Sequence, residues 1–165
     1  MRSGKEMNKV RLYHGSNVPV YVPEIRVTYP HDFGNAFYVT SDFRQAKKWA
    51  LHKAKYSGKA YVSCYTMDKE VLRYIRTLYF NQPSKKWLDL VVKCRQNKYQ
   101  PNGDLIIGPV MDGRKSWISL RLYSQHKLTY EETLDRLNTH VLSDQWAFTG
   151  IRALSFLNFC EVIEV

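Results

Sequence analysis

His14, Gly15 and Ser16, in the stretch "LYHGS" (12–16), place an imidazole, an unobstructed backbone and a hydroxyl next to one another. Glycine allows a ligand to approach the backbone closely, and its amide and carbonyl can both bind a carboxamide. The same tripeptide also fits an ordinary junction between a strand and a turn. The stretch is therefore a candidate binding element that needs support from a second motif.

The stretch "FGNAFYVTS" (33–41) places Phe37 and Tyr38 just after a glycine turn and puts Thr40 and Ser41 beside them. An exposed ring in this position can stack on a planar, electron-poor heterocycle. Neighbouring residues of a strand face opposite sides, so one ring can belong to the core while the other lines a site. The alternative is that both rings are core residues. The pattern predicts a clamp for a flat ligand, flanked by the hydroxyls.

Other motifs that would indicate a known chemistry are missing from the sequence. The five histidines lack the i, i+4 spacing of a metalloprotease helix, so we expect no metal site. The sequence has no GxxxxGK[ST] or GxGxxG phosphate-binding motif and no GxSxG nucleophile motif. The three cysteines are odd in number and widely spaced, which favours reduced thiols in a cytoplasmic protein.

The formal net charge of +10 favours an acidic partner, such as a nucleic acid, a phosphate-bearing cofactor or an acidic protein. A basic surface that is merely solvated is the alternative. We expect a solvated basic helix face at Lys47, Lys48, Lys53, Lys55 and Lys59, with contact to nucleic acid or substrate as the alternative. Three tryptophans are expected in the core: Trp87, Trp117 and Trp146.

The length of 165 residues and an apolar fraction of 44% predict one folded domain over 9–165, preceded by a flexible segment at 1–8. No run approaches the roughly 18 to 20 apolar residues of a membrane-spanning helix, and no signal-peptide core follows the start. We therefore expect a cytoplasmic protein.

Hydrophobic periodicity predicts an α+β fold, because the strands and helices follow one another without a βαβ alternation. Strands are expected at 9–13, 35–40, 59–67, 104–110, 145–149 and 160–165, and the proline-containing segment 17–31 is expected to be irregular. Helices are expected at 42–56, 84–96, 115–124, 130–138 and 151–157. Two capping boxes are predicted, Asp42 with Gln45 and Thr129 with Glu132.

Together the two motifs resemble those of the ADP-ribosyltransferase superfamily, which includes the poly(ADP-ribose) polymerases and diphtheria-like toxins of the His-Tyr-Glu type. "LYHGS" is similar to the first motif and "DFGNAFYVTSDFRQAKKWA" (32–50) to the second. A closer resemblance is to small, largely uncharacterised bacterial members, which share "DLIIGPV" (104–110) and a late "DQWAFT…ALSFL" stretch. This resemblance spans most of 11–160 and implies split mixed and antiparallel sheets packed with helices.

The resemblance implies a role for each matching residue. His14 is similar to the histidine that binds the adenosine ribose of NAD, and Ser16 would help to hold that ribose. Gly15 is similar to the residue whose backbone holds the nicotinamide carboxamide. Tyr38, which follows His14 by 24 residues, is similar to the tyrosine that stacks on nicotinamide. Trp49 falls where the polymerases place a second stacking aromatic.

The third catalytic position resembles Gln145, where the well-known enzymes have glutamate. Glutamine can hydrogen-bond the nicotinamide-ribose hydroxyl, but it supplies no negative charge to an oxocarbenium-like transition state. Glu161 or Glu164 in the last strand is an alternative source of a carboxylate. Ala36 replaces the second glycine of the turn, which is a mild departure from the pattern.

The resemblance implies a mono-ADP-ribosyltransferase that uses NAD as co-substrate and needs no metal. It further implies a bacterial toxin or effector, held in check by a partner protein. Three alternatives stay open: an NAD-binding or nucleic-acid-binding module without turnover, an NAD glycohydrolase, and an interaction domain without a cofactor. The sequence does not choose between tRNA, DNA and an acidic protein as the macromolecular acceptor.

Overall fold

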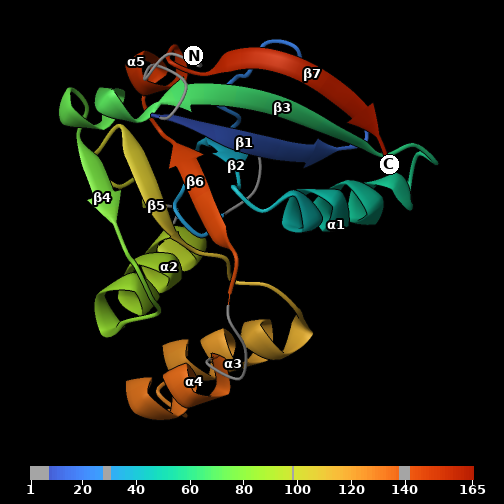
Figure 1. The fold of residues 1–165 in the computed structure, drawn as a ribbon. Coiled ribbons are helices and arrows are strands. Elements are labelled where there is room, and N and C mark those ends of the chain that lie inside the picture. The colour runs from blue at the N-terminus through green and yellow to red at the C-terminus, as the bar shows by residue number, and fades with distance from the viewer. Residues whose placement is uncertain (1–7, 28–30, 98, 138–141) are drawn as a thin grey trace.

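Two β-sheets form the framework in the computed structural model, which describes residues 8–27, 31–97, 99–137 and 142–165 (Figure 1). The first is antiparallel, with the order β1-β3-β7: β1 (Lys9–Ser16), β3 (Tyr61–Asp68) and β7 (Asn158–Glu164). The second has the order β2-β6-β5-β4: β2 (Phe37–Val39), β6 (Asp144–Phe148), β5 (Leu105–Pro109) and β4 (Thr77–Tyr79). It is mixed, because β4 pairs with β5 in parallel while the other pairs are antiparallel.

Five α-helices lie in the described residues: α1 (Phe43–Ala54), α2 (Lys85–Asn97), α3 (Arg114–Ser124), α4 (Tyr130–Leu137) and α5 (Ile151–Leu154). A short 3₁₀ helix, η1 (Lys69–Arg73), follows β3. In Figure 1, α1 lies beside the three-stranded sheet, and α2 to α4 lie on the side of the four-stranded sheet. The predicted α+β class in a single domain is therefore confirmed. The expected flexible segment 1–8 falls, apart from Asn8, outside the described residues.

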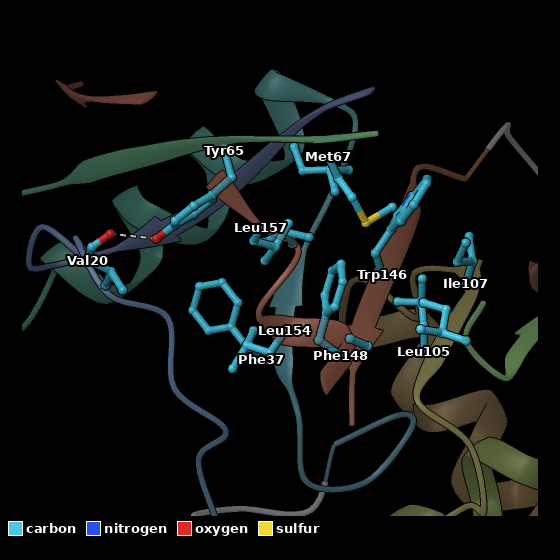
Figure 2. Close-up of a cluster of buried hydrophobic side chains, with 14 residues drawn as sticks. Val20, Phe37, Tyr65, Met67, Leu105, Ile107, Trp146, Phe148, Leu154 and Leu157 are labelled. Carbon is cyan, nitrogen blue, oxygen red and sulfur yellow. Dashed lines mark hydrogen bonds between the residues drawn. The ribbon is translucent and has the colours of Figure 1, made fainter. Parts of the chain in front are cut away.

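The main core fills the space between the two sheets. Strand residues alternate between the two faces of a sheet, so every second side chain points into this core. On β6, Trp146 and Phe148 point into this core, and Ala147 belongs to the cluster on the opposite face. Figure 2 shows these side chains packed with residues from both sheets, from α5 and from the segment after it, among them Tyr65, Met67, Leu105, Ile107, Leu154 and Leu157. The Tyr65 hydroxyl donates a hydrogen bond to the Val20 carbonyl, which holds the irregular segment against this core (Figure 2).

Two smaller clusters attach the helices to the outer faces of the sheets. Ala46 and Ala50 of α1 pack on Val62 of the three-stranded sheet. Trp87, Leu88 and Val91 of α2 pack with Ile106 and Ala147 on the other sheet. Small residues on α1 allow that helix to lie close to the three-stranded sheet. The helix thereby contributes residues to the wall of the cavity described below.

Most predicted elements are confirmed, with shifted ends. Strand β1 continues to Ser16, because Gly15 and Ser16 still pair with Val62 and Tyr61 of β3. His14 therefore lies inside a strand and not at its end. The predictions missed η1 and β4, which are short and poor in buried residues.

One of the two predicted capping boxes forms. In the second, the Glu132 carboxylate accepts from the Thr129 amide and the Thr129 hydroxyl accepts from the Glu132 amide. At α1 the box is wrong, although Asp42 does cap the helix by accepting from the Arg44 amide at 3.0 Å. The Asp42 amide donates to the Thr40 hydroxyl at 3.1 Å and not to the Gln45 side chain, so the box is not closed.

Candidate functional site

A cavity of about 1440 Å³ lies between α1 with β1 on one side and the four-stranded sheet with α3 on the other. Its volume exceeds the roughly 300 to 1,000 Å³ that is usual for small-molecule pockets. All six residues singled out in the sequence line it: His14, Gly15, Ser16, Tyr38, Trp49 and Gln145. The fold thus brings the two early motifs and the late glutamine to one place.

The edge of β1 forms one wall of the cavity. Tyr13 exchanges two backbone hydrogen bonds with Thr40, at 2.8 and 2.9 Å, on the side away from β3. Backbone groups alternate in direction along a strand, so Gly15 presents its amide and carbonyl to the same side. No strand of the described residues covers that side at Gly15, and its carbonyl accepts a hydrogen bond from Lys53 Nζ at 3.1 Å. A ligand amide can pair with this short stretch of open edge.

Gly15 is also required by the packing of α1. A Cβ placed on it would lie 1.9 Å from the carbonyl oxygen of Ala46 and 2.8 Å from the amide nitrogen of Ala50. Only a residue without a side chain permits α1 to approach β1 so closely. This contact places Trp49 and Lys53 of α1 in the cavity wall.

The His14 ring is held in one orientation and one tautomer. Its Nδ1 donates to the Tyr38 carbonyl oxygen at 2.7 Å, since a carbonyl can only accept, which leaves Nε2 as a hydrogen-bond acceptor. The ring stacks on Phe37 with centroids 4.5 Å apart. Desolvation by burial is the largest cause that lowers the pKa of His14, to about 4, and the Lys53 charge adds to the effect. His14 is therefore neutral near pH 7.

This pKa predicts how the stability of the fold changes with pH. The pKa of His14 falls from 6.5 to about 4 on folding, so between these values the unfolded chain binds more protons than the folded chain. The stabilisation is complete above that window and is lost as the pH falls through it. We expect acidification from about pH 7.5 to about pH 4.5 to remove roughly 2–3 kcal/mol of stability through this one group.

Urea denaturation of the wild type and of His14→Gln at the two pH values checks this prediction. Carboxylate titration contributes equally to both proteins, so the difference between their pH effects isolates the imidazole. An equal loss of stability in the two proteins would contradict a half-buried, neutral His14.

Tyr38 presents a fixed ring, while Phe37 joins the main core as strand alternation predicted. The Tyr38 hydroxyl donates to the Gly34 carbonyl at 2.7 Å and accepts from the Phe33 amide at 3.1 Å. Desolvation raises the pKa of the phenol, so it stays protonated and does not act as a base. The ring beside Tyr38 is that of His31, at 5.1 Å between centroids. Trp49 lines the same cavity from α1.

Gln145 is buried at the base of the cavity, and both hydrogens of its amide are used. Nε2 donates to Asp32 Oδ2 at 2.7 Å and to the Pro109 carbonyl at 3.0 Å. An amide nitrogen carries two hydrogens, so only Oε1 is left to interact with a ligand, and only as an acceptor. The side chain therefore offers a fixed acceptor for a hydroxyl.

Asp32 organises this end of the cavity, and sequence analysis did not select it. Its carboxylate accepts from Gln145, from the Met111 amide and from the guanidinium of Arg95, with which it forms a buried ion pair. The Arg95 guanidinium lies 3.4 Å from the centroid of the Trp117 ring. The Trp117 side of the cavity is open, because this residue is 40% exposed, and the prediction that it is a core residue is wrong.

The hydroxyls of Thr40 and Ser41 do not flank the cavity. Both donate to the carboxylate of Asp144, at 3.0 and 2.7 Å, and Trp146 Nε1 donates to the same group at 2.8 Å. They join β2 to the start of β6 and so fix the position of Gln145. Their expected place beside a flat ligand is therefore wrong. Glu161 and Glu164 lie on β7 and do not line the cavity, so neither of these expected alternatives to Gln145 lies beside the other candidate residues.

A family model described as a protein of unknown function, DUF3990, matches residues 10–159. The chain belongs to the DUF3990 family. No curated protein and no solved structure matches it. The DUF3990 match covers all six cavity residues named above, but it assigns no activity to them.

Two further findings concern the helices and the cysteines of this DUF3990 chain. In the described ranges, no helix combines the length and apolar character that crossing a membrane requires. Cys64, Cys94 and Cys160 are free thiols, of which only Cys160 is exposed.

Proposed function

We propose that the cavity binds NAD and that the protein transfers its ADP-ribose to a macromolecular acceptor. The observation that carries this proposal is that His14, the open backbone edge at Gly15 and the Tyr38 ring line one cavity. The expected ADP-ribosyltransferase-like arrangement of the two sheets is part of the same proposal. So is the role of a bacterial toxin or effector with an inhibitory partner, which the resemblance implies.

The residues present fit the parts of NAD. The amide and carbonyl of Gly15 can pair with a carboxamide, and the fixed ring of Tyr38 offers a surface for the nicotinamide ring. Neutral His14 offers Nε2 to a ribose hydroxyl. Two other basic side chains that line the cavity, Arg26 and Lys53, complement a diphosphate.

The reaction joins a nucleophile of the acceptor to C1′ of the nicotinamide-bearing ribose, while the bond from C1′ to nicotinamide breaks. Nicotinamide leaves with the bonding electron pair, and the proton of the nucleophile passes to solvent. The chain contributes positioning: Tyr38 and Gly15 orient the leaving group, and Gln145 Oε1 accepts from a ribose hydroxyl.

The contacts of Gln145 explain why glutamine occupies a position where the well-known enzymes have glutamate. A glutamate would place a second carboxylate at hydrogen-bond distance from Asp32 and would have no hydrogen for the Pro109 carbonyl. Glutamine therefore fits this site better. Because glutamine adds no negative charge, we expect transfer to be slower by on the order of 10²-fold than with a carboxylate, which favours single transfers over polymer elongation.

Incubation with NAD that carries separate labels on the adenylate phosphate and on nicotinamide tests the proposal. Release of nicotinamide with phosphate label fixed to a macromolecule is the expected result. Free ADP-ribose without a labelled macromolecule would instead indicate an NAD glycohydrolase. Saturable NAD binding without release would indicate a binding module. An unchanged melting temperature in excess NAD, together with no release, would leave an interaction domain.

A further inference from the structure

Two helices at the opening of the cavity lie in segments that contain lysines and arginines but no acidic residue. Between Asp42 and Asp68 the chain has six lysines and arginines and no acidic residue, and α1 lies in this interval. Between Asp112 and Glu131 it has four and again no acidic residue, and α3 lies there. Cavity-lining residues come from both helices, so the two basic segments border the same opening.

Several of these cations have no ion-pair partner within the described ranges. Lys48 of α1 pairs with Asp112, just before α3, so one ion pair joins the two sides of the opening. Lys47, Lys55 and Arg114 are exposed and line the cavity, and no carboxylate of the described residues pairs with them. Three uncompensated charges around one opening attract a polyanion.

An exposed aromatic ring lies among these cations. Trp117 of α3 lines the opening and has the Arg95 guanidinium against its ring at 3.4 Å. Arg95 is fixed in turn by its buried ion pair with Asp32, so the tryptophan is supported and not merely exposed. Supported aromatic rings next to cations are typical of surfaces on which nucleobases stack.

We propose that the macromolecular acceptor is a single-stranded nucleic acid, whose phosphates contact Lys47, Lys55 and Arg114 and one of whose bases stacks near Trp117. This inference rests on the proposed ADP-ribosyl transfer. The strand must be single, because a base stacked in a duplex cannot reach groups inside a cavity. A nitrogen or oxygen of the nucleotide forms the new bond to C1′, nicotinamide leaves with the bonding pair, and the displaced proton passes to solvent.

An acidic polypeptide is the competing acceptor, because it would satisfy the same three charges. It would, however, give the ring of Trp117 no flat partner. Stacking on Trp117 therefore distinguishes a nucleic-acid acceptor from an acidic polypeptide, and a variant at this position tests which of the two binds.

Fluorescence anisotropy without NAD tests the surface independently of turnover. The probes are fluorescein-labelled strands of roughly 20 nucleotides, as DNA, as RNA and as a duplex, together with a polyglutamate chain. We expect a single strand to bind, with affinity that falls steeply between about 50 and about 200 mM salt. Preference for DNA or for RNA identifies the acceptor and supports the proposal in either case.

Two variants localise the binding. The triple variant K47S/K55S/R114S should bind at least about tenfold more weakly and lower the salt slope by about 2, since each lost phosphate contact removes about 0.7. Trp117→Ala should weaken single-strand binding about tenfold. The matched control K9S/K69S/K86S removes three exposed lysines outside the cavity and should bind nearly as the wild type does.

Several results would overturn the inference. These are equal weakening in the control triple variant, equal or tighter binding of polyglutamate or duplex, and an unchanged affinity of Trp117→Ala. Transfer of label from NAD to a protein, without strand binding, would also overturn it while leaving ADP-ribosyl transfer in place. Strand binding by the surface, without any release of nicotinamide from NAD, would instead contradict the proposed function and with it the acceptor role.

Discussion

Gly15→Ala is expected to lower the stability of the fold by about 3 kcal/mol. The added methyl group would lie 1.9 Å from the Ala46 carbonyl oxygen, and backbone atoms of a helix cannot give way as a flexible side chain can. Helix α1 would have to move away from β1 and carry Trp49 and Lys53 with it. For a chain of this size the loss corresponds to a fall in melting temperature of roughly 10 °C.

Gly103→Ala is the matched control for this substitution. The nearest atom to a Cβ at Gly103 is the Arg76 carbonyl oxygen at 3.6 Å, an ordinary van der Waals distance. We expect thermal melting to leave the Gly103 variant within about 0.5 kcal/mol of the wild type. Equal melting temperatures for the two variants would contradict the close contact of α1 with β1.

Asp32→Asn is expected to reduce stability by about 3–5 kcal/mol, although the two side chains have nearly the same shape. Every group of the described residues that hydrogen-bonds the Asp32 carboxylate is a donor: the Arg95 guanidinium, the Met111 amide and the Gln145 amide. Asparagine has one acceptor oxygen and one NH₂ group, so in either orientation it places hydrogens against hydrogens. It also leaves the partly buried charge of Arg95 without its partner.

Chemical denaturation of Asp32→Asn beside Asp89→Asn checks this prediction. Asp89 pairs with Lys85 on the exposed side of α2, so its substitution should change stability by no more than about 1 kcal/mol. The double variant D32L/R95M removes both charges and should recover part of the loss, since no buried charge is left alone, although the Met111 and Gln145 amides still lose their acceptor. Independent, additive losses at Asp32 and Arg95 would contradict the coupling.

The sequence predictions and the structure agree most closely in the stretch "FGNAFYVTS" (33–41). Alternation along 35–40 predicted that Phe37 and Tyr38 face opposite sides, and this holds because β2 is a regular strand paired with β6. The helix after Asp42 was predictable for the same local reason, a capping side chain followed by a periodic apolar face. These features depend on neighbours in the sequence.

The end of the cavity around Asp32 could not be predicted from the sequence, because its contacts join segments far apart in the chain. Asp32 follows the proline-containing segment, and Arg95 lies near the end of α2, yet they form a buried ion pair. No periodicity marks an arginine on a helix as the partner of an aspartate 63 residues earlier. Trp117 was misjudged for a related reason, since its exposure depends on how α3 is placed beside the cavity.

Thr40 and Ser41 show a second limit. Their position beside two aromatic rings suggested contact with a ligand, but both hydroxyls bind Asp144. The residue types correctly indicated that these hydroxyls make polar contacts. Their partner, Asp144, becomes apparent only from the pairing of β2 with β6. The same is true of Gln145, whose two amide donors are used inside the protein.

Calorimetric titration with NAD of the wild type, Tyr38→Phe and Tyr38→Leu tests whether the cavity binds NAD with nicotinamide against the Tyr38 ring. We expect saturable binding to the wild type and to Tyr38→Phe, which keeps the ring, and about tenfold weaker binding to Tyr38→Leu, which loses the stacking surface. An absence of NAD binding to the folded wild type, or equal affinity for the phenylalanine and leucine variants, would contradict this binding mode.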